Sequence, residues 1–268
     1  MRRLREFFAK WLVARDSPNQ SPDSRQPNLA ILRRDRSRRD HRRYRKYDFK
    51  RRELAREFVF LKRIRYLRAI SISETTFTAI DFESAGTARG RTDAPVQIGL
   101  GTWKVAGGIS DPYVSFLHCD QEITWAAQKV HGITTDDLTD APSLLSLWPV
   151  LKKRLGAGPV VAHGHGTEKR FLRTFPGHRF GPWIDTLQLA RAAWPEEPSH
   201  SLGDLCSARG ISDFSDHAPD RAWHDALYDA LASLALLKQL VQEFELADRP
   251  LDLLLKPDTS TWHRLRHS

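Results

Sequence analysis

Two acidic residues, Asp81 and Glu83, stand at the end of an apolar, β-branched run over residues 75–82. Such a run is typical of a buried β-strand, where residues two apart point to the same side. Both carboxylates are therefore expected on one side of a sheet, with Phe82 on the other. Because neighbouring carboxylates repel each other, the pair favours a bound cation. The alternative is a pair of solvated acids where the strand meets a loop.

A small, turn-forming segment, Ser84 to Gly86, follows the two acids. Small residues in a turn let another backbone approach closely. A substrate strand lying against the carboxylates would use this space. We therefore predict that Phe82, Ser84 and Gly86 contact the substrate.

A third carboxylate, Glu168, follows a short apolar run at 160–161 and a glycine-rich turn. The pattern predicts a buried strand and then a helix whose first turn carries Glu168, where an acid also interacts favourably with the helix dipole. Such a junction would bring Glu168 to the same end of the sheet as Asp81. Asp185, at the end of another short strand, would join these acids or cap the helix that follows it.

His224 and Asp229 stand at the start of a helix predicted over residues 223–241. Asp229 falls near the edge of the apolar face of this helix, an unusual place for a carboxylate that is merely solvated. His217 is an alternative to His224, but only His224 precedes by five residues an aspartate that alanine follows. The pair His224-Asp225 also suggests a metal phosphohydrolase of another type, whose companion motifs are absent from this sequence.

Two further histidines fall close to these acidic segments. His131, in the segment VHGIT at 130–134, is predicted either to contact a terminal base or to stabilise a turn. His163 precedes the glycine-rich turn and is predicted to contact the substrate. Together with His165 it forms no pattern of metal ligands.

Several segments follow one another in a characteristic order: AIDFES at 79–84, VHGIT at 130–134, VAHGHGTEKRFL at 161–172, IDTLQLAR at 184–191, HSLGDLCSARGI at 200–211 and HDALYDA at 224–230. Their order and spacing resemble the DEDDh exonucleases, the superfamily of DNA-polymerase proofreading subunits and RNase T. The resemblance covers residues 75–241. It rests on the segments jointly, because each alone is a weak pattern.

The resemblance implies an RNase H-like fold and a metal-dependent 3′→5′ exonuclease. Such an enzyme releases nucleoside 5′-monophosphates from single-stranded 3′ ends, and we expect DNA to be favoured. The resemblance also implies that two Mg²⁺ or Mn²⁺ ions bind Asp81, Glu83, Asp229 and Glu168, with Asp81 bridging both. His224 would take a proton from the attacking water. A DNA polymerase or another replication or repair protein is a candidate partner.

One position departs from the family pattern. Glu168 stands where the family has aspartate, and Gly164 and Thr167 replace the usual asparagine and phenylalanine. The additional methylene moves the carboxylate by about 1.5 Å, the length of a carbon–carbon bond. We expect activity to be retained, because the other positions fit. The alternative is a catalytically impaired module that binds nucleic-acid ends or a polymerase.

The elements that must position these residues form an α/β pattern. Strands are predicted at 75–82, 96–104 and 113–118, separated by turns at 107–108 and 111–112, and helices are predicted at 143–155, 167–174, 186–193, 201–208 and 223–241. Three strands joined by turns, followed by strands that alternate with helices, predict a mixed sheet. Its first three strands would be antiparallel and the later ones parallel, with helices flanking the sheet.

The positive charge of the chain is confined to its N-terminal part. The net charge is +9, yet residues 1–70 hold 23 Lys and Arg against 8 Asp and Glu, so the remainder is net −6. The arginine-rich run at 33–52 predicts nucleic-acid binding. The alternatives are a protein or membrane-surface partner that binds residues 1–14, or a solubilising tail.

We expect three parts: an arginine-rich extension at 1–70 with an amphipathic helix over about 49–69, an exonuclease domain at 71–241, and a tail at 242–268. The two cysteines, Cys119 and Cys206, provide no disulfide framework and favour a reducing, cytoplasmic location. The longest apolar stretches, such as Leu231 to Leu237, are too short to cross a bilayer, so no transmembrane segment is expected.

Overall fold

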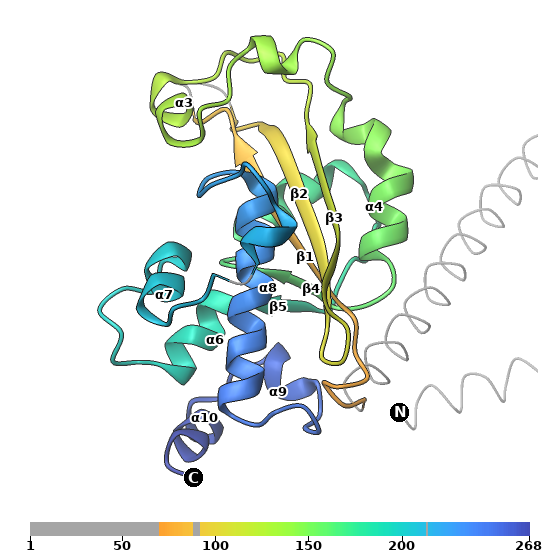
Figure 1. The fold of residues 1–268 in the computed structure, drawn as a ribbon. Coiled ribbons are helices and arrows are strands. Elements are labelled where there is room, and N and C mark those ends of the chain that lie inside the picture. The colour runs from red at the N-terminus through yellow and green to blue at the C-terminus, as the bar shows by residue number, and fades with distance from the viewer. Residues whose placement is uncertain (1–69, 88–91, 213) are drawn as a thin grey trace, which may run out of the picture. The chain divides into compact units, whose positions relative to one another are not determined.

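The computed structural model describes residues 70–87, 92–212 and 214–268. The arginine-rich run and the amphipathic helix predicted over 49–69 lie outside the described residues. The elements below are labelled as in Figure 1.

A mixed sheet forms the centre of the fold (Figure 1). Its strands are β1 (Phe77–Ser84), β2 (Pro95–Lys104), β3 (Gly108–Phe116), β4 (Val160–Ala162) and β5 (Trp183–Asp185). Their order is β3-β2-β1-β4-β5; β1 is antiparallel to β2 and β2 to β3, whereas β4 is parallel to both β1 and β5. The predicted fold class is confirmed: three antiparallel strands come first, and parallel strands follow.

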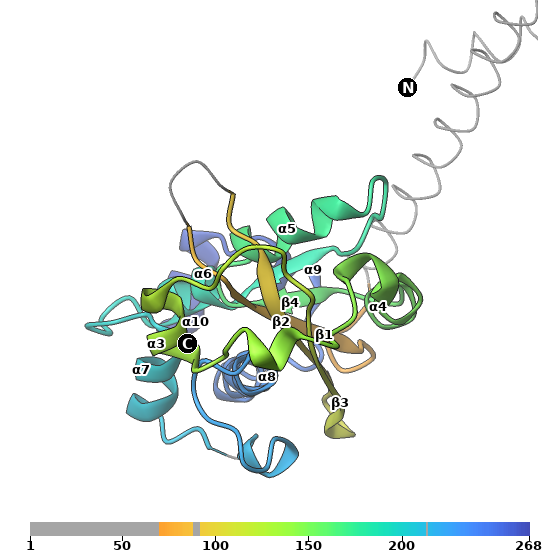
Figure 2. The ribbon, with the colours of Figure 1, turned by 90° about the horizontal axis from the view of Figure 1, so that it is seen from above.

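Helices flank this sheet. They are α3 (Trp125–His131), α4 (Trp148–Leu155), α5 (Gly166–Phe171), α6 (Thr186–Ala193), α7 (Leu202–Ala208), α8 (Ala226–Glu243), α9 (Asp252–Leu255) and α10 (Thr259–Arg266). Short 3-10 turns are η2 (Asp136–Leu138), η3 (Leu144–Leu147), η4 (Leu172–Thr174) and η5 (Ser215–His217). Seen from above, α8 and α5 lie on opposite sides of β1 (Figure 2). The sheet therefore has two covered faces, and each face has its own core.

Alternation along β1 distributes its side chains between the two cores. Phe77 and Ala79 belong to the core that includes the buried residues of α8. Ile80 and Phe82 belong to the core formed with α4 and α5. The same alternation places residue 81 and residue 83 on the face that α8 covers.

Strand β3 begins five residues earlier than predicted, at Gly108 instead of residue 113. The Asp111-Pro112 pair lies inside the strand, where Asp111 adopts a left-handed conformation with φ 55°. The pairing register of β2 with β3 shifts nearby, between Leu100 and Thr102. An edge strand tolerates such a bulge and a proline without an N–H group, and β3 lies at the edge of the sheet.

The helix predicted over 143–155 is divided into two pieces. Ser143 caps the first piece, η3, by accepting a hydrogen bond from the N–H of Ser146 at 3.2 Å. Helix α4 then starts at Trp148, with a proline in its first turn. Proline suits that position because it lacks the N–H group that an internal helical position would need.

Residues after α8 pack against the same core as α8 itself. Trp262 of α10 is fully buried, and its ring meets that of Phe244 edge-on at a centroid distance of 5.3 Å. Leu246, Leu251 and Leu254 are buried in the same cluster. The segment that we expected to be a tail therefore contributes to the hydrophobic core beneath α8.

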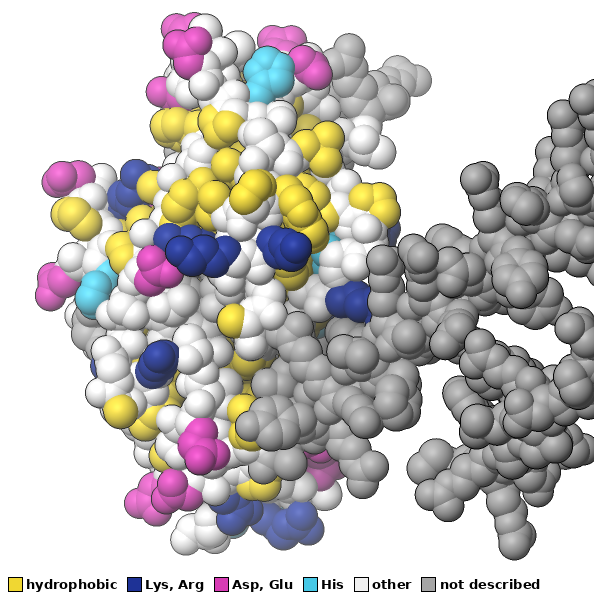
Figure 3. Space-filling view, turned by 90° about the vertical axis from the view of Figure 1, so that its right-hand side faces the viewer, with side chains coloured by type: hydrophobic (Ala, Val, Ile, Leu, Met, Phe, Trp, Pro, Cys, Tyr) yellow, Lys and Arg dark blue, Asp and Glu magenta, His cyan; other side chains and the backbone are white. Residues whose placement is uncertain are grey.

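Figure 3 shows the side of the molecule that carries α4 and β3. Hydrophobic side chains gather on it, with Lys and Arg side chains close by. Phe116 and Leu145 are exposed hydrophobic residues of β3 and η3, with 37% and 60% of their surface accessible. These side chains belong to no part of the site described below. Among the described residues, no helix is both long and apolar enough to cross a membrane.

Candidate active site

The first two acids lie near the end of β1, on the face that α8 covers. Burial raises the pKa of Asp81 well above its ordinary value, and the carboxylates of Glu168, Asp229 and Glu83 raise it further. Burial also raises the pKa of Glu83 to about 8, and the charges of Asp229 and Asp225 add to that shift. Both carboxyl groups are therefore difficult to ionise unless a cation is close by.

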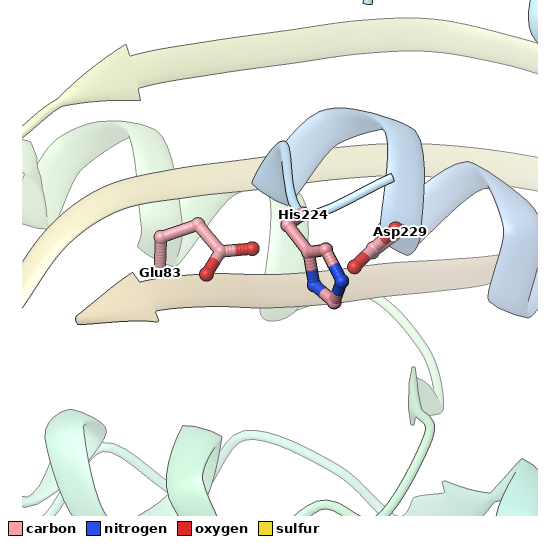
Figure 4. A group of neighbouring side chains, drawn as sticks. All are labelled: Glu83, His224 and Asp229. Carbon is pink, nitrogen blue, oxygen red and sulfur yellow. The ribbon is translucent and has the colours of Figure 1, made fainter. Parts of the chain in front are cut away.

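The start of α8 brings a histidine and another acid to these residues. Asp229 lies in the first turn of α8, and His224 directly precedes Asp225, the residue that caps the helix. One ligand atom from each of Glu83, His224 and Asp229 can be chosen so that all three lie within 4.8 Å of one another. Figure 4 shows the three side chains pointing toward one another, from β1, from the coil before α8 and from α8. His224 is exposed, so the group opens to solvent.

Glu168 completes the acidic group from the opposite direction. It lies in the first turn of α5, with only 5% of its surface accessible. Burial is the main reason that its pKa is raised to about 7. Its charge also raises the pKa of Asp81. The longer side chain therefore still brings an acid to the group.

The acidic group has the properties of a metal site. One carboxylate oxygen of Glu168 and one of Asp229 are buried without a hydrogen-bond partner. Burial also raises the pKa of Asp229 to about 7, despite a hydrogen bond from the backbone of His224 that lowers it. Buried polar atoms without partners are rare in proteins. A divalent cation would satisfy these oxygens and neutralise their charges, so the residues fit a metal ion.

A cavity of about 480 Å³ adjoins His224. It is lined by His131 on one side and by the segment 219–225 on the other.

We expect the metal-free protein to lose thermal stability as the pH rises from about 5 to about 8. Carboxyl groups with raised pKa values keep protons in the folded state that the unfolded state has already released. Ionisation between the ordinary and the raised values therefore disfavours folding. Melting temperatures measured with a chelator across this range should fall by several degrees.

Added Mg²⁺ or Mn²⁺ should reduce that fall, because a bound cation favours the ionised carboxylates. The Asp81→Asn variant serves as the matched control and should show a shallower dependence on pH without metal. Parallel curves with and without metal would show that the carboxyl groups do not bind a cation.

His131 connects α3 to the end of β1. Its Nε2 lies 3.0 Å from the backbone oxygen of Ser84, and its Nδ1 accepts a hydrogen bond from the N–H of Ile133 at 3.0 Å. Both ring nitrogens are therefore engaged within the protein. Of the two roles predicted for His131, these contacts favour the stabilised turn over contact with a terminal base.

The remaining predicted substrate contacts have other partners in the structure. Phe82 is 6% accessible, and its ring meets Phe171 at 5.3 Å on the face opposite the acids. His163 bonds to the hydroxyl of Thr186 at 3.0 Å and to the backbone oxygen of His200 at 2.9 Å. A substrate at the carboxylates would therefore meet the backbone of Phe82 and not its ring. His163 holds β4 to neighbouring segments.

Gly86 is required by the packing of the protein itself. A Cβ atom at this position would lie 2.3 Å from Oγ1 of Thr124, which caps α3. Its φ of 82° also favours glycine. Nearby, Ser84 contributes its backbone oxygen to the bond with His131. The turn after β1 is thus adapted to the close approach of α3.

Two positions bear on alternatives that the sequence leaves open. Asp185 accepts hydrogen bonds from the N–H groups of Leu187 and Gln188 at 3.0 and 3.3 Å, so it caps α6, and its charge also raises the pKa of Glu168. His217 lies in η5 and does not belong to the group of possible metal ligands found among the described residues, whereas His224 does.

Three residues around the start of α8 have contacts that the sequence pattern does not predict. Gln97 of β2 is buried, and Asp225 and Arg221 form an ion pair beside it. A signal for Gln97 was present, because a polar residue interrupts the apolar run of β2. Gly99, two residues on, is also unusual in a strand interior and often marks the close approach of another backbone.

Comparisons with known proteins agree with this geometry. The exonuclease family of RNase T matches residues 78–237. The PolC-type DNA polymerase III of Bacillus cereus is 29% identical over 180 residues, which cover 64% of this chain and 12% of that protein. The corresponding polymerase of Oceanobacillus iheyensis is 31% identical over 178 residues, with the same shares. The match thus covers about one eighth of the length of these relatives.

Solved structures of nucleases share the fold. Exonuclease X in complex with 5′-overhanging duplex DNA has a TM-score of 0.55 and 26% identity, covering 67% of this chain and 99% of that one. The nuclease domain of 3′hExo, described as a DEDDh family member bound to rAMP, has a TM-score of 0.52 and 16% identity. It covers 66% of this chain and 96% of its own, and at this identity it shows the fold alone. The resemblance inferred from the ordered segments is confirmed: the chain belongs to the exonuclease family, within the DnaQ-like 3′–5′ exonuclease superfamily.

Proposed function

We propose that this protein is a metal-dependent 3′→5′ exonuclease that releases nucleoside 5′-monophosphates from single-stranded 3′ ends. One observation carries the proposal: four carboxyl groups have raised pKa values, and two of them, Glu83 and Asp229, have an oxygen within 4.8 Å of the exposed His224. Buried acids that raise one another's pKa values are more typical of a functional site than of a structural role.

The residues that would hold metal ions are Asp81, Glu83, Glu168 and Asp229. Ligands that are mostly oxygens suit Mg²⁺ or Mn²⁺. Asp81 is the candidate for contact with both ions, because its pKa responds to each of the other three acids. Two such ions supply electrostatic stabilisation for the attacking and leaving oxygens of a phosphodiester.

His224 is proposed to take the proton from the attacking water. It is exposed beside the cavity, and its side chain points toward Glu83 and Asp229 (Figure 4). An imidazole exchanges protons readily near neutral pH, and a base must lie within hydrogen-bonding reach of the water that it activates. The protein's own contribution is therefore to hold the base, the acids and the end of the substrate in one small region.

The substrate class rests on the relatives. Exonuclease X was solved with duplex DNA, and the PolC-type relatives are DNA polymerases, so we propose DNA as the favoured substrate. Because 3′hExo was solved with bound rAMP, the experiment below includes RNA as well as DNA. Because these relatives are DNA polymerases, a polymerase or another replication or repair protein is proposed as a partner.

The decisive experiment uses single-stranded DNA and RNA of the same sequence, each labelled once at the 5′ end and once at the 3′ end. A 3′→5′ exonuclease releases the 3′ label first, as a mononucleotide, only when Mg²⁺ or Mn²⁺ is present. Binding without release, in either metal, would support the alternative of an impaired module that binds ends. Early release of the 5′ label would contradict the proposed direction.

We expect Glu168→Gln to lower kcat by roughly 10²-fold or more, because the amide keeps the size of the side chain but loses its charge near the substrate. Glu168→Asp should retain much more activity, since the carboxylate remains. The measurement is the rate of mononucleotide release under saturating substrate and metal.

Glu196→Gln is the matched control, because Glu196 is exposed and its replacement removes the same charge. Its rate should equal that of the wild type. If Glu168→Gln were as active as the wild type, Glu168 would not belong to the catalytic group.

A further inference from the structure

Helix α8 begins directly on strand β2, and a buried amide connects them. Gln97 is 2% accessible. Its Oε1 accepts a hydrogen bond from the N–H of Ala226 at 2.8 Å, and its Nε2 donates to Oδ2 of Asp225 at 2.8 Å. Both polar ends of this side chain are therefore bound to the first residues of the α8 segment.

The neighbouring position on the same face of β2 makes room for that helix. A Cβ atom on Gly99 would lie 2.1 Å from the carbonyl carbon and oxygen of Ala226. Real Cβ atoms do not approach backbone so closely, so any side chain at Gly99 would displace the start of α8. Gln97 binds the start of α8, and Gly99 leaves space for its backbone. We call these two residues the β2 seat.

The sheet register places the β2 seat opposite the two acids of β1. Gln97 pairs with Glu83, and Gly99 pairs with Asp81. Paired residues of antiparallel strands carry their Cβ atoms on the same face, about 5 Å apart. The start of α8 is thus attached to β2 directly beside the carboxylates that it must meet.

Asp225 transmits this attachment to the catalytic side chains. Its Oδ1 accepts hydrogen bonds from the N–H groups of Leu227 and Tyr228 at 3.0 and 3.3 Å, and its Oδ2 is also bound by Arg221. His224 lies between Arg221 and Asp225, in a left-handed conformation with φ 68°.

Asp229 is fixed to the same residue through the first turn of the helix. Its N–H donates to the backbone oxygen of Asp225 at 3.0 Å. Movement of Asp225 would therefore displace His224 and Asp229 together.

We propose that the β2 seat is the positioning device of the active site. Gln97, through Asp225, sets His224 and Asp229 at the correct distance from Asp81 and Glu83. Gln97 and Gly99 touch no reacting atom in this scheme and act through α8. The inference rests on the proposed function, and it adds residues that the acidic group alone does not identify.

The chemistry of Gln97 favours positioning over simple packing. Its neighbours on β2, Val96 and Ile98, are fully buried and apolar. A buried amide is costly unless both ends are satisfied, as they are here, and an apolar residue would leave the N–H of Ala226 and Oδ2 of Asp225 without these partners. The amide adds two directional hydrogen bonds, and these bonds hold α8 at one place along the strand. Catalytic rates respond strongly to such placement: a shift of about 1 Å can cost roughly 10²-fold.

The test exchanges the donor and acceptor of the Gln97–Asp225 hydrogen bond. Gln97→Glu places two carboxylates against each other, and Asp225→Asn places an amide donor where Asp225 accepted from Gln97. The double variant restores a hydrogen bond in the opposite direction, from Asn to Glu, and retains the wild-type net charge. We expect each single variant to lower kcat by about 10- to 100-fold with little change in KM. The double variant should recover to within a few-fold of the wild type.

Mn²⁺ affinity, measured by electron paramagnetic resonance without substrate, provides a second readout. Asp225→Asn should weaken Mn²⁺ binding, and the double variant should restore it, because Asp229 moves with α8. Thr102→Val is the matched control: Thr102 is a polar residue of β2 whose hydroxyl bonds to the backbone oxygen of Ser110 in β3. It should leave both kcat and Mn²⁺ affinity unchanged.

The inference would be overturned if the fall in kcat of the double variant equalled the product of the falls in the single variants. It would also be overturned if the single variants kept the kcat and Mn²⁺ affinity of the wild type. A lower melting temperature with unchanged kcat would also overturn it, by showing that Gln97 only stabilises the fold. If the wild type releases no mononucleotide, the proposed exonuclease function fails. Recovery of Mn²⁺ affinity in the double variant would then still decide whether the β2 seat positions α8.

Discussion

Replacing Asp81 with asparagine should reduce nucleotide release by about 10³-fold or more. The carboxyl group of Asp81 interacts with those of Glu83, Glu168 and Asp229, so it has a central place in the acidic group. The amide of asparagine keeps the shape of the side chain, but it offers a metal ion one neutral oxygen in place of the two oxygens of a charged carboxylate. The measurement is the single-turnover rate on labelled single-stranded DNA with Mg²⁺ or Mn²⁺.

The same substitution should raise the melting temperature of the metal-free protein at alkaline pH, because it removes a buried carboxylate that its neighbours repel. Loss of activity together with gain of stability distinguishes a functional acid from a structural one. Asp248→Asn, at an exposed position, is the control and should change neither quantity. Near-normal turnover of Asp81→Asn would remove Asp81 from the mechanism.

The second large effect is expected for His224→Ala, which should lower kcat by about 10²- to 10⁴-fold, the usual range for a lost general base. The affinity for a single-stranded 3′ end should change much less, because the acids and the cavity remain. The two quantities are measured separately, by single-turnover hydrolysis with metal and by fluorescence anisotropy with a chelator.

His217→Ala is the matched control, since His217 lies outside the group formed by Glu83, His224 and Asp229. A large loss in His217→Ala with an unchanged rate in His224→Ala would transfer the role of base to His217. His224 is also close enough to the two acids to be a metal ligand. A large fall in Mn²⁺ affinity in His224→Ala would therefore show that His224 binds the metal ion instead of taking a proton from the water.

Much of the fold follows from local patterns. The alternation of β1 predicts that Asp81 and Glu83 share a face, and the apolar face of the helix at 223–241 predicts α8, which spans Ala226–Glu243. The predicted start of α8 is early because Asp225 caps the helix with its side chain and so remains extended. Such local hydrogen bonds move helix ends by a few residues without changing the pattern that precedes them.

The side-chain partners within the site could not be predicted in the same way. Gln97 and Asp225 are 128 residues apart in sequence, and no periodicity connects them. His163 and Phe82 were expected at the substrate because of their neighbours in sequence, yet their contacts are with Thr186 and Phe171. The packing of Trp262 beneath α8 is likewise a long-range contact that a short segment cannot reveal. Tertiary packing decides these positions.

The raised pKa values of the acids also affect how metal binding is coupled to the solvent. Because burial raises the pKa of Glu83 to about 8 and those of Glu168 and Asp229 to about 7, these carboxyl groups hold protons at neutral pH when no metal is present. An arriving cation must displace these protons, so loading the site acidifies its surroundings. The heat of metal binding will then include the ionisation heat of the buffer that takes up the protons. Apparent affinity will rise with pH, and a mildly acidic medium will hold the protein in its proton-loaded, metal-poor form.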